Sequence, residues 1–246
     1  HKITNSYANL TNLALRIAPA NAKRDAPAVL ISAHFDSISA SVGASDCAAC
    51  VATALEIARA VVADGARELR GPLIVLLNGG EEAYSPAAHA FLTQHRWASD
   101  VVAVMNLESS GPGGYDLLFQ AAGAEAIAAY IKAAPHPHAH VSAQDLFRFG
   151  AIPADTDFTV FSDRRYGPLL GIDIATILDG EAYHTREDTY GRIQPGSLQV
   201  MGENTLAVAL ELSAVFSAMP AGRTEGGTSA GSYFDVLGLF MVHYRR

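Results

Sequence analysis

The sequence predicts a single α/β domain built on a mixed, largely parallel sheet that helices cover on both faces. Short apolar runs rich in β-branched residues alternate along the chain with longer segments of helical period. The runs are mostly apolar, which is typical of strands buried on both faces of a parallel sheet. The chain has 246 residues, 50% of them hydrophobic, which is enough to bury a core around one such sheet.

Five short apolar runs are the predicted strands. Turn-forming residues flank them, as Gly71-Pro72 and Asn78-Gly79-Gly80 do for the third run. The predicted strands are residues 13–17, 29–33, 73–77, 101–107 and 172–178.

Four longer segments are the predicted helices. In the first, apolar residues recur at threes and fours, which predicts a buried face made of Ala49, Ala52, Leu55, Ala58 and Val62. In the second, Ser85 is expected at the N-cap, with Pro86 at the first helical position. The predicted helices are residues 46–62, 85–94, 124–133 and 197–216.

The C-terminal part of the chain differs in composition from the rest. Residues 219–232 are rich in Gly, Ser and Thr, which predicts a loop or linker. Residues 233–242 are apolar but too short to cross a bilayer. We therefore expect one domain over residues 1–218, followed by a linker and C-terminal segment over residues 219–246.

Charge and cysteine content exclude several classes of protein. The formal net charge is −8 and no run of Lys or Arg exceeds two residues, so nucleic acid is not an expected partner. Two cysteines cannot form a disulfide-rich scaffold. The chain begins at His1 with no visible signal peptide, so we expect a processed chain or an excised domain.

Chemically active residues follow four of the predicted strands and open the first predicted helix. The carboxyl ends of parallel strands meet at one edge of a sheet, where ligands bind. Two imidazoles and three carboxylates suit zinc, and one carboxylate with two oxygens can bridge a pair of metal ions. Adjacent Glu81 and Glu82 allow one carboxylate to bind metal and the other to accept a proton. The candidates are His34, Asp36, Asp46, Glu81, Glu82, Glu108, Tyr183 and His184.

Each candidate also has an ordinary structural interpretation. His34 alone would more often be a hydrogen-bonded structural histidine, and Glu81-Glu82 alone a solvated turn. Asp46 alone could be an N-cap. Only their joint placement at one sheet edge favours a metal site.

Five motifs occur in a characteristic order. They are His34-Phe35-Asp36-Ser37, Gly43-Ala44-Ser45-Asp46, Asn78-Gly79-Gly80-Glu81-Glu82-Ala83, Asn106-Leu107-Glu108 and Tyr183-His184-Thr185. Together they resemble the co-catalytic zinc aminopeptidase family of the MH metallopeptidase clan, over roughly residues 9–215. The resemblance implies a zinc-peptidase fold, two zinc ions per chain, and hydrolysis of the N-terminal bond of peptides or proteins.

The resemblance also implies a ligand set. His34 and Glu108 would bind one zinc, Glu82 and His184 the other, and Asp46 would bridge the two. Glu81 would be the general base that takes a proton from the activated water and returns it to the leaving amine.

Further residues would support these ligands by the same resemblance. Asp36 would orient His34 by accepting its ring N–H. Tyr183 would donate a hydrogen bond to the oxyanion. Asp157 would have a structural or supporting role, and the Asp46–Cys47 peptide would be cis.

A finer resemblance points to one branch of the family. Residues 142–161, 171–189 and 196–212 look like the luminal peptidase domains of endoplasmic reticulum metallopeptidases and fungal vacuolar membrane proteases. This implies the luminal ectodomain of a membrane protein, with membrane contact only through segments outside this chain. Residues 233–246 look like the segment that leads into that membrane region. The sequon Asn9-Leu10-Thr11 would then make Asn9 a glycosylation site.

Two positions depart from the family pattern. The family usually has a second acid where Cys47 stands, and more commonly Asp where Glu108 stands. The branch with the finer resemblance retains Glu at the second position, so we expect the metal site to be kept.

Three further motifs have weaker functional interpretations. Cys47-Ala48-Ala49-Cys50 matches the CxxC of thiol-disulfide enzymes, but the charge of Asp46 disfavours a reactive thiolate there. Residues 227–231 match GxSxG, but the strand that should precede this motif is missing. His136, His138 and His140 are expected on a surface loop.

Two alternatives on the same fold remain open. One is a glutaminyl cyclase that holds a single zinc ion, and the other is a non-enzymatic ectodomain that binds a partner. The presence of five ligand residues together with Glu81 favours the peptidase. The N-terminal residue preference and the oligomeric state are not predicted by the sequence.

Overall fold

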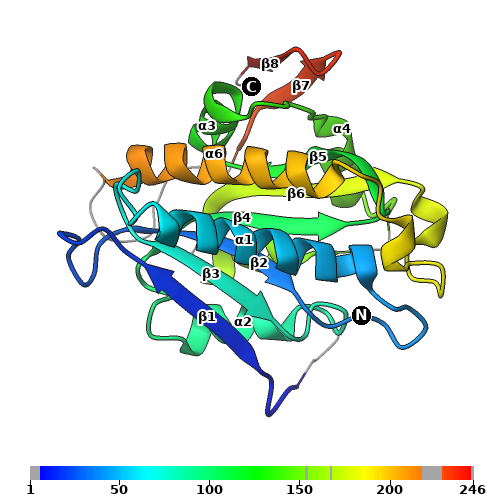
Figure 1. Ribbon diagram of the computed structural model, residues 1–246, viewed down its shortest axis with the longest axis horizontal. Coiled ribbons are helices and arrows are strands. Elements are labelled where there is room, and N and C mark those ends of the chain that lie inside the picture. Colours follow the sequence, from blue (N-terminus) through cyan, green and yellow to red (C-terminus); the bar gives the residue numbers. More distant parts are fainter. Residues whose placement is uncertain (1–5, 153–154, 167, 218–228, 245–246) are drawn as a thin grey trace.

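The protein has a six-stranded central sheet, seen in a computed structural model that describes residues 6–152, 155–166, 168–217 and 229–244 (Figure 1). Strands β2, β3, β4 and β6 are parallel neighbours, whereas β1 and β5 lie antiparallel at the two edges. This confirms a mixed, largely parallel sheet. In the order β1-β3-β2-β4-β6-β5, the strands are Asn12–Ile17, Leu73–Asn78, Ala28–His34, Val101–Ser109, Leu170–Leu178 and Gly113–Ala122.

The central strands are buried along their whole length, as their apolar composition predicts. Every residue of β2, β3 and β4 is buried, whereas β1 alternates between half-buried and exposed positions before the buried Ile17, as an edge strand with one solvated face does. Strand β5 was not predicted from the sequence. All five predicted strands are present, with bounds that differ by at most two residues.

Helices cover both faces of the sheet. Helices α1, α3 and α6 pack on the strand side chains of one face of the sheet, and α2 and α5 pack on those of the opposite face. Figure 1 shows α1 and α6 lying across one face. The helices are α1 (Cys50–Ala63), α2 (Pro86–Gln94), α3 (Ala124–Ala133), α4 (Val141–Arg148), α5 (Asp157–Phe161) and α6 (Ser197–Ser217). Single helical turns lie at η1 (Ala44–Ala49), η2 (Arg164–Tyr166), η3 (Gly180–Ala182) and η4 (Tyr190–Arg192).

The predicted buried face of the first helix was mostly wrong, because only Ala58 of its five residues is buried. The regular helix begins only at Cys50, because Asp46 and Cys47 have non-helical backbone angles. Leu55 and Val62 are 49% and 57% exposed. The helix is rich in alanine, so its apolar residues are compatible with more than one buried face. The face that packs on the sheet is the one that carries Ile57 and Val61. The buried residues are Cys50, Thr53, Ala54, Ile57, Ala58 and Val61.

The C-terminal residues form a hairpin that packs on the rest of the domain. Strands β7 (Ser232–Val236) and β8 (Phe240–Tyr244) pair antiparallel beside α4 and α3 (Figure 1). Tyr233 is fully buried, and its hydroxyl donates to Gln144 Oε1 at 3.1 Å. Residues 218–228, which include most of the predicted linker, lie outside the described residues. In the part of the chain that the structure describes, no helix is both long and apolar enough to span a membrane.

Candidate metal centre

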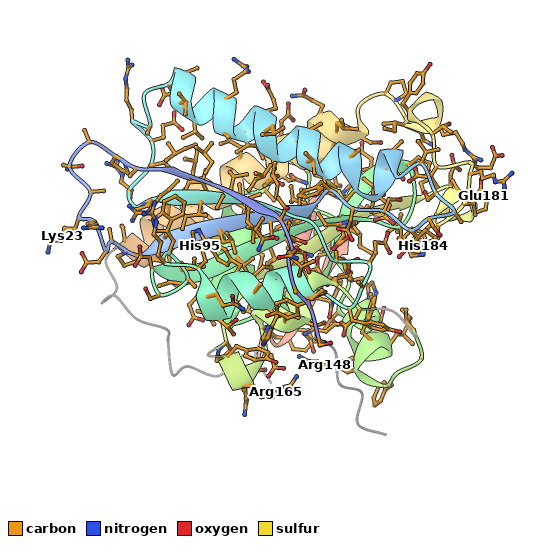
Figure 2. All side chains as sticks on the ribbon, turned by 90° about the horizontal axis from the view of Figure 1, so that it is seen from below. Lys23, His95, Arg148, Arg165, Glu181 and His184 are labelled. Atoms are coloured by element: carbon orange, nitrogen blue, oxygen red, sulfur yellow. A yellow bond between two sulfur atoms is a disulfide. The ribbon has the colours of Figure 1, made fainter. Side chains whose placement is uncertain are left out.

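The predicted site residues meet at the carboxyl ends of the parallel strands. His34 ends β2 and pairs in register with Asn78, which ends the neighbouring strand β3. Glu108 lies near the end of β4, on the other side of β2. Figure 2 shows His184, which follows β6, at the end of the molecule opposite Lys23. The topology therefore brings residues from four strand ends to one place.

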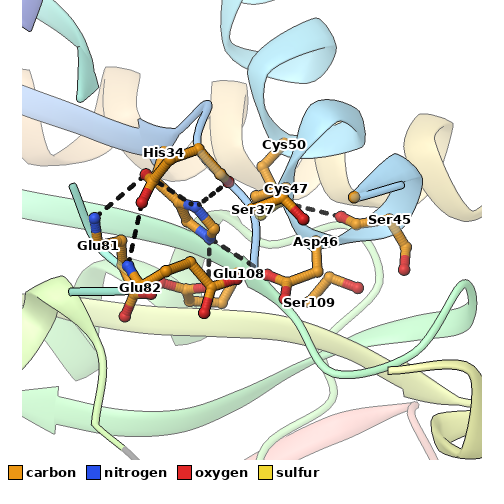
Figure 3. Close-up of polar contacts among 12 residues, drawn as sticks. His34, Ser37, Ser45, Asp46, Cys47, Cys50, Glu81, Glu82, Glu108 and Ser109 are labelled. Atoms are coloured by element: carbon orange, nitrogen blue, oxygen red, sulfur yellow. Dashed lines mark hydrogen bonds and ion pairs between the residues drawn. A yellow bond between two sulfur atoms is a disulfide. The ribbon is translucent and has the colours of Figure 1, made fainter. Parts of the chain in front are cut away.

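Asp46 lies at the centre of this group, between the two histidines. Its Oδ1 is 3.2 Å from His34 Nε2, and its Oδ2 is 3.1 Å from His184 Nε2. Glu108 Oε2 lies 3.5 Å from His34 Nε2 (Figure 3). Glu82 Oε2 lies 3.2 Å from His184 Nε2. Each oxygen of Asp46 thus faces a different imidazole, and each imidazole has one further carboxylate.

The donor atoms of this group fit a divalent cation. Ligand atoms of His34, Asp46 and Glu108 lie within 4.8 Å of one another, as do those of Asp46, Glu82 and His184. His34 Nε2, Asp46 Oδ2 and Glu82 Oε1 are buried without a hydrogen-bond partner. Buried polar atoms normally have hydrogen-bond partners, so several that converge without partners indicate a place where a metal ion would bind. Two imidazoles with carboxylate oxygens are ligands that zinc accepts.

The segment that carries Asp46 is held by Asp188, which sequence reasoning did not single out. The Asp188 carboxylate accepts hydrogen bonds from Ser45 N at 2.8 Å, Ser45 Oγ at 2.6 Å and Asp46 N at 3.2 Å. The Asp46–Cys47 peptide is cis, as expected. One hint of a role for Asp188 was present in the sequence, which is its position four residues after His184. Its hydrogen-bond partners could not be predicted, because they lie more than 140 positions away in the sequence.

Asp36 contacts His34 mainly through its backbone. His34 Nδ1 donates to the Asp36 carbonyl oxygen at 3.0 Å and lies 3.5 Å from Asp36 Oδ1. A proton held on Nδ1 leaves the lone pair of Nε2 facing the donor cluster. The Asp36 carboxylate also accepts from the backbone N–H groups of Glu81 and Glu82, at 3.1 and 3.2 Å (Figure 3). Asp36 therefore also positions the turn that carries both glutamates.

Several carboxylates share this small space. Burial, followed by the negative charges of Glu108 and Asp157, raises the pKa of Glu81 to about 10. Burial, followed by the charge of Asp46, raises the pKa of Glu82 to about 7. Each ionised carboxylate disfavours ionisation of the next, and a bound cation would offset this repulsion.

A layer of buried amides supports the site from the strands. Asn106 Nδ2 donates to Glu108 Oε1 at 3.1 Å and to Asp173 Oδ1 at 3.0 Å. Asp157, fully buried at the start of α5, accepts a hydrogen bond from Asn78 Nδ2. The sequence did not predict that Asn106 and Asp173 support the site. Each is a polar residue inside an otherwise mostly apolar strand, which could have indicated such a role. Ser85, at the N-cap of α2 as predicted, does not cap the helix and instead hydrogen-bonds Asp157.

Tyr183 lies beside the donor cluster, stacked on His184 with ring centroids 3.7 Å apart. Burial, followed by the negative charges of Asp46 and Glu108, raises the pKa of Tyr183 well above its usual range. The hydroxyl therefore keeps its proton at neutral pH and can act as a hydrogen-bond donor.

An apolar pocket of about 260 Å³ opens beside Asp46, Glu81, Glu108 and Tyr183. Most of its exposed lining is carbon. The apolar residues around it come from β5, α4, β6 and the loop after α4, namely Leu117, Phe119, Ala143, Phe147, Ile152, Ala175 and Ile177. A ligand side chain of moderate size that fills this pocket would lie next to the candidate metal ligands.

The two cysteines are joined by a disulfide, Cys47–Cys50, at the start of α1. Both residues are buried. Cys47 directly follows Asp46, and its sulfur lies within 4.8 Å of ligand atoms from His34, Asp46 and Glu108. The CxxC motif therefore lies against the donor cluster, but without a free thiol.

The remaining candidates lie away from this centre. Asn9 is exposed just before β1. His136 pairs with Glu203 at 2.7 Å, His138 stacks on Tyr115, and His140 accepts from Ser142 N, so the three imidazoles have separate partners. Of the GxSxG match, Gly227 and Thr228 lie outside the described residues.

Comparison of sequences identifies relatives over nearly the whole chain. Residues 12–209 match peptidase family M28. The chain is 42% identical over 244 residues to "Endoplasmic reticulum metallopeptidase 1" of Homo sapiens, covering 98% of this chain and 26% of the relative. It is 36% identical over 173 residues to "Vacuolar membrane protease" of Schizosaccharomyces pombe, covering 70% of this chain and 20% of the relative. The chain thus spans about a quarter of the length of the first relative.

Solved structures share the fold at low sequence identity. A zinc aminopeptidase from Bacillus subtilis matches with a TM-score of 0.60 and 16% identity, covering 88% of this chain and 53% of the other. A glutaminyl cyclase from Porphyromonas gingivalis matches with a TM-score of 0.61 and 19% identity, covering 82% and 77%. At these identities the likeness concerns the fold alone.

Proposed function

The chain belongs to peptidase family M28, and from this premise we propose that it is a zinc-dependent aminopeptidase with two metal ions that share Asp46. His34 and Glu108 complete one set of ligands, and Glu82 and His184 complete the other. The observation that carries the proposal is the placement of the two Asp46 oxygens, each about 3 Å from a different histidine nitrogen.

The zinc ions, when bound, supply Lewis-acid polarisation of the scissile carbonyl and lower the pKa of the attacking water. Glu81 borders the pocket beside the ligands without being part of either ligand cluster. It accepts the proton of the attacking water and passes it to the leaving amine. Asp36 holds Glu81 through the backbone. Tyr183 donates its hydroxyl proton in a hydrogen bond to the oxyanion that forms at the carbonyl.

The apolar pocket supports cleavage next to a hydrophobic residue. Because the pocket opens beside Glu81 and Asp46, the side chain that precedes the scissile bond fits into it. The substrate is then a peptide or protein whose N-terminal side chain is apolar and of moderate size. Burial of such a side chain contributes about 1.5–3 kcal/mol to binding.

We also propose a luminal location in the endoplasmic reticulum or vacuole, in a membrane protein whose membrane contacts lie outside this chain. Two relatives, an endoplasmic reticulum metallopeptidase and a vacuolar membrane protease, support this location by their names. Asn9, exposed in the sequon Asn9-Leu10-Thr11, is then a site of glycosylation.

The test begins with zinc per chain, measured by elemental mass spectrometry on protein purified without chelator. Two zinc ions with hydrolysis of aminoacyl substrates support the proposal. One zinc ion with cyclisation of N-terminal Gln would favour the glutaminyl cyclase, which shares the fold. No zinc after reconstitution would favour a non-enzymatic ectodomain.

Glu81→Gln then tests the general base. We expect kcat to fall by about 10²–10⁴-fold with zinc content unchanged, because the amide cannot accept the proton. Glu125→Gln, at an exposed position on α3 away from the site, is the matched control. Asp46→Ala should lose zinc, and retention of both ions in that variant would contradict the bridging role.

A further inference from the structure

We propose that Cys47 is a redox-controlled metal ligand: the disulfide with Cys50 leaves its sulfur without a thiolate, and reduction lets the thiolate bind the ion held by His34, Asp46 and Glu108. The proposal rests on the metal site proposed above. It concerns a ligand that the proposed aminopeptidase reaction does not use.

The position of the Cys47 sulfur is the first observation. It lies within 4.8 Å of a nitrogen of His34 and of carboxylate oxygens of Asp46 and Glu108, and these four residues are all buried. The next ligand cluster, of Asp46, Glu82 and His184, does not include it. A thiolate at Cys47 would therefore serve one of the two proposed zinc ions.

The composition of that ligand cluster is the second observation. It offers one imidazole and two carboxylates, which are three protein ligands. Catalytic zinc sites combine three protein ligands with an open position for water, whereas structural sites are closed by a fourth protein ligand, often cysteine. A thiolate from Cys47 would fill the open position, converting a catalytic site into a closed one.

The redox step needs a dithiol as reductant. The dithiol gives two electrons and two protons and becomes a cyclic disulfide, while the Cys47–Cys50 bond breaks and each cysteine receives one hydrogen. Cys47 then releases its proton to solvent, and its sulfur donates an electron pair to the metal. Both cysteines are buried, so the start of α1 must open before the reductant can attack.

A simpler role for the disulfide makes a different prediction. The bridge could act only as a clamp on the start of α1, where Ala49 at the N-cap provides no side-chain hydrogen bond. In that case Cys47→Ser and Cys50→Ser must behave alike, because each removes the same bridge. Under our proposal they differ, because only Cys50→Ser leaves a thiol at position 47.

The experiment compares these two variants loaded with Co²⁺. We expect a thiolate-to-cobalt charge-transfer band in the near ultraviolet for Cys50→Ser and none for Cys47→Ser. Loss of a residue that only supports a metal ligand lowers metal affinity about 10–100-fold. Because Cys50→Ser keeps the proposed direct ligand and Cys47→Ser removes it, Cys50→Ser should bind zinc at least about tenfold more tightly. Zinc affinity is measured by competition with a chelating indicator.

The unmodified protein provides the reversible form of the test. After treatment with a dithiol and removal of the reagent under argon, free thiols are counted and the Co²⁺ spectrum is recorded. We expect two thiols, the same band as in Cys50→Ser, and loss of both on reoxidation. This measurement also replaces the comparison if either variant fails to fold.

Two results would overturn the proposal. One is identical spectra and zinc affinities for the two variants, which would leave the disulfide as a clamp. The other is a disulfide that stays intact in the folded protein under excess dithiol. Failure of the proposed function looks different, because the unmodified, oxidised protein would then bind fewer than two zinc ions.

Discussion

Among single residues, Asp188 determines where Asp46, the central residue of the proposed metal site, lies. It is buried, and its carboxylate accepts all three hydrogen bonds that hold the backbone and side chain of Ser45 and the backbone of Asp46. A charged acceptor of this kind is stronger than a neutral one, and it also keeps the donors of a tight turn satisfied. The position of Asp46 therefore depends on a residue that is not itself one of the proposed ligands.

Asp188→Ala should weaken both folding and metal binding. The buried donors of Ser45 and Asp46 lose their acceptor, which costs about 1–3 kcal/mol in the free energy of unfolding. Loss of the group behind a metal ligand lowers metal affinity about 10–100-fold. Urea unfolding and zinc competition measure the two effects, with exposed Glu187→Ala as the control. Zinc affinity equal to that of the control would show that Asp188 does not position Asp46.

The ease of predicting a site residue depended on how local its role is. His34 and Glu108 could be predicted because each lies at or near the end of an apolar strand. Asp188 and Asp173 could not be assigned a role, because their partners lie far away in the chain. Periodicity shows which residues are buried, but it does not show which distant polar groups meet there.

Among the elements, strands with continuous apolar runs were predicted well and mixed ones were not. Strand β5 begins with Gly113 and Gly114 and contains Asp116, three residues of types that strands disfavour. It forms because its second half packs in the core and pairs with β6. Helix α4 has eight residues, half of them polar, and α5 has five, which are too few for a clear periodic signal.

The corrected face of α1 gives a direct test at this scale. Ile57 is buried against the sheet, whereas Leu55, two positions earlier, is 49% exposed. Ile57→Ala should lower the free energy of unfolding by about 2–5 kcal/mol, because it leaves a cavity in the core. Leu55→Ala should change it by no more than about 0.5 kcal/mol. Chemical denaturation of both variants measures the difference, and the reverse order would restore the face predicted from the sequence.

At the scale of the whole molecule, the C-terminal hairpin belongs to the packed structure. The fully buried Tyr233 joins the same core cluster as residues of α3 and α6. Backbone N–H of Ala139 donates to Asp235 Oδ1 at 3.0 Å, which ties β7 to the segment before α4. Composition alone predicted a linker and terminal segment here, because the Gly- and Ser-rich stretch hides the packing of the residues that follow it.

Tyr233→Ala should therefore destabilise the whole domain. Removal of a buried aromatic side chain costs about 3–5 kcal/mol. Leu237→Ala, at a side chain 87% exposed in the hairpin turn, should have almost no effect. For Tyr233→Ala we expect a single cooperative unfolding transition whose midpoint lies at a lower denaturant concentration. An unchanged midpoint would mean that the hairpin is dispensable for the fold.

The apolar pocket has a consequence for how this protein can diversify. Its walls come mainly from β5, α4 and the loop after α4, whereas the proposed metal ligands come from other segments, at or after β2, β3, β4 and β6. Substitutions at wall positions such as Phe147 or Leu117 can reshape the pocket without altering any ligand. Gene duplicates can thus acquire differently shaped pockets while natural selection preserves the proposed metal ligands.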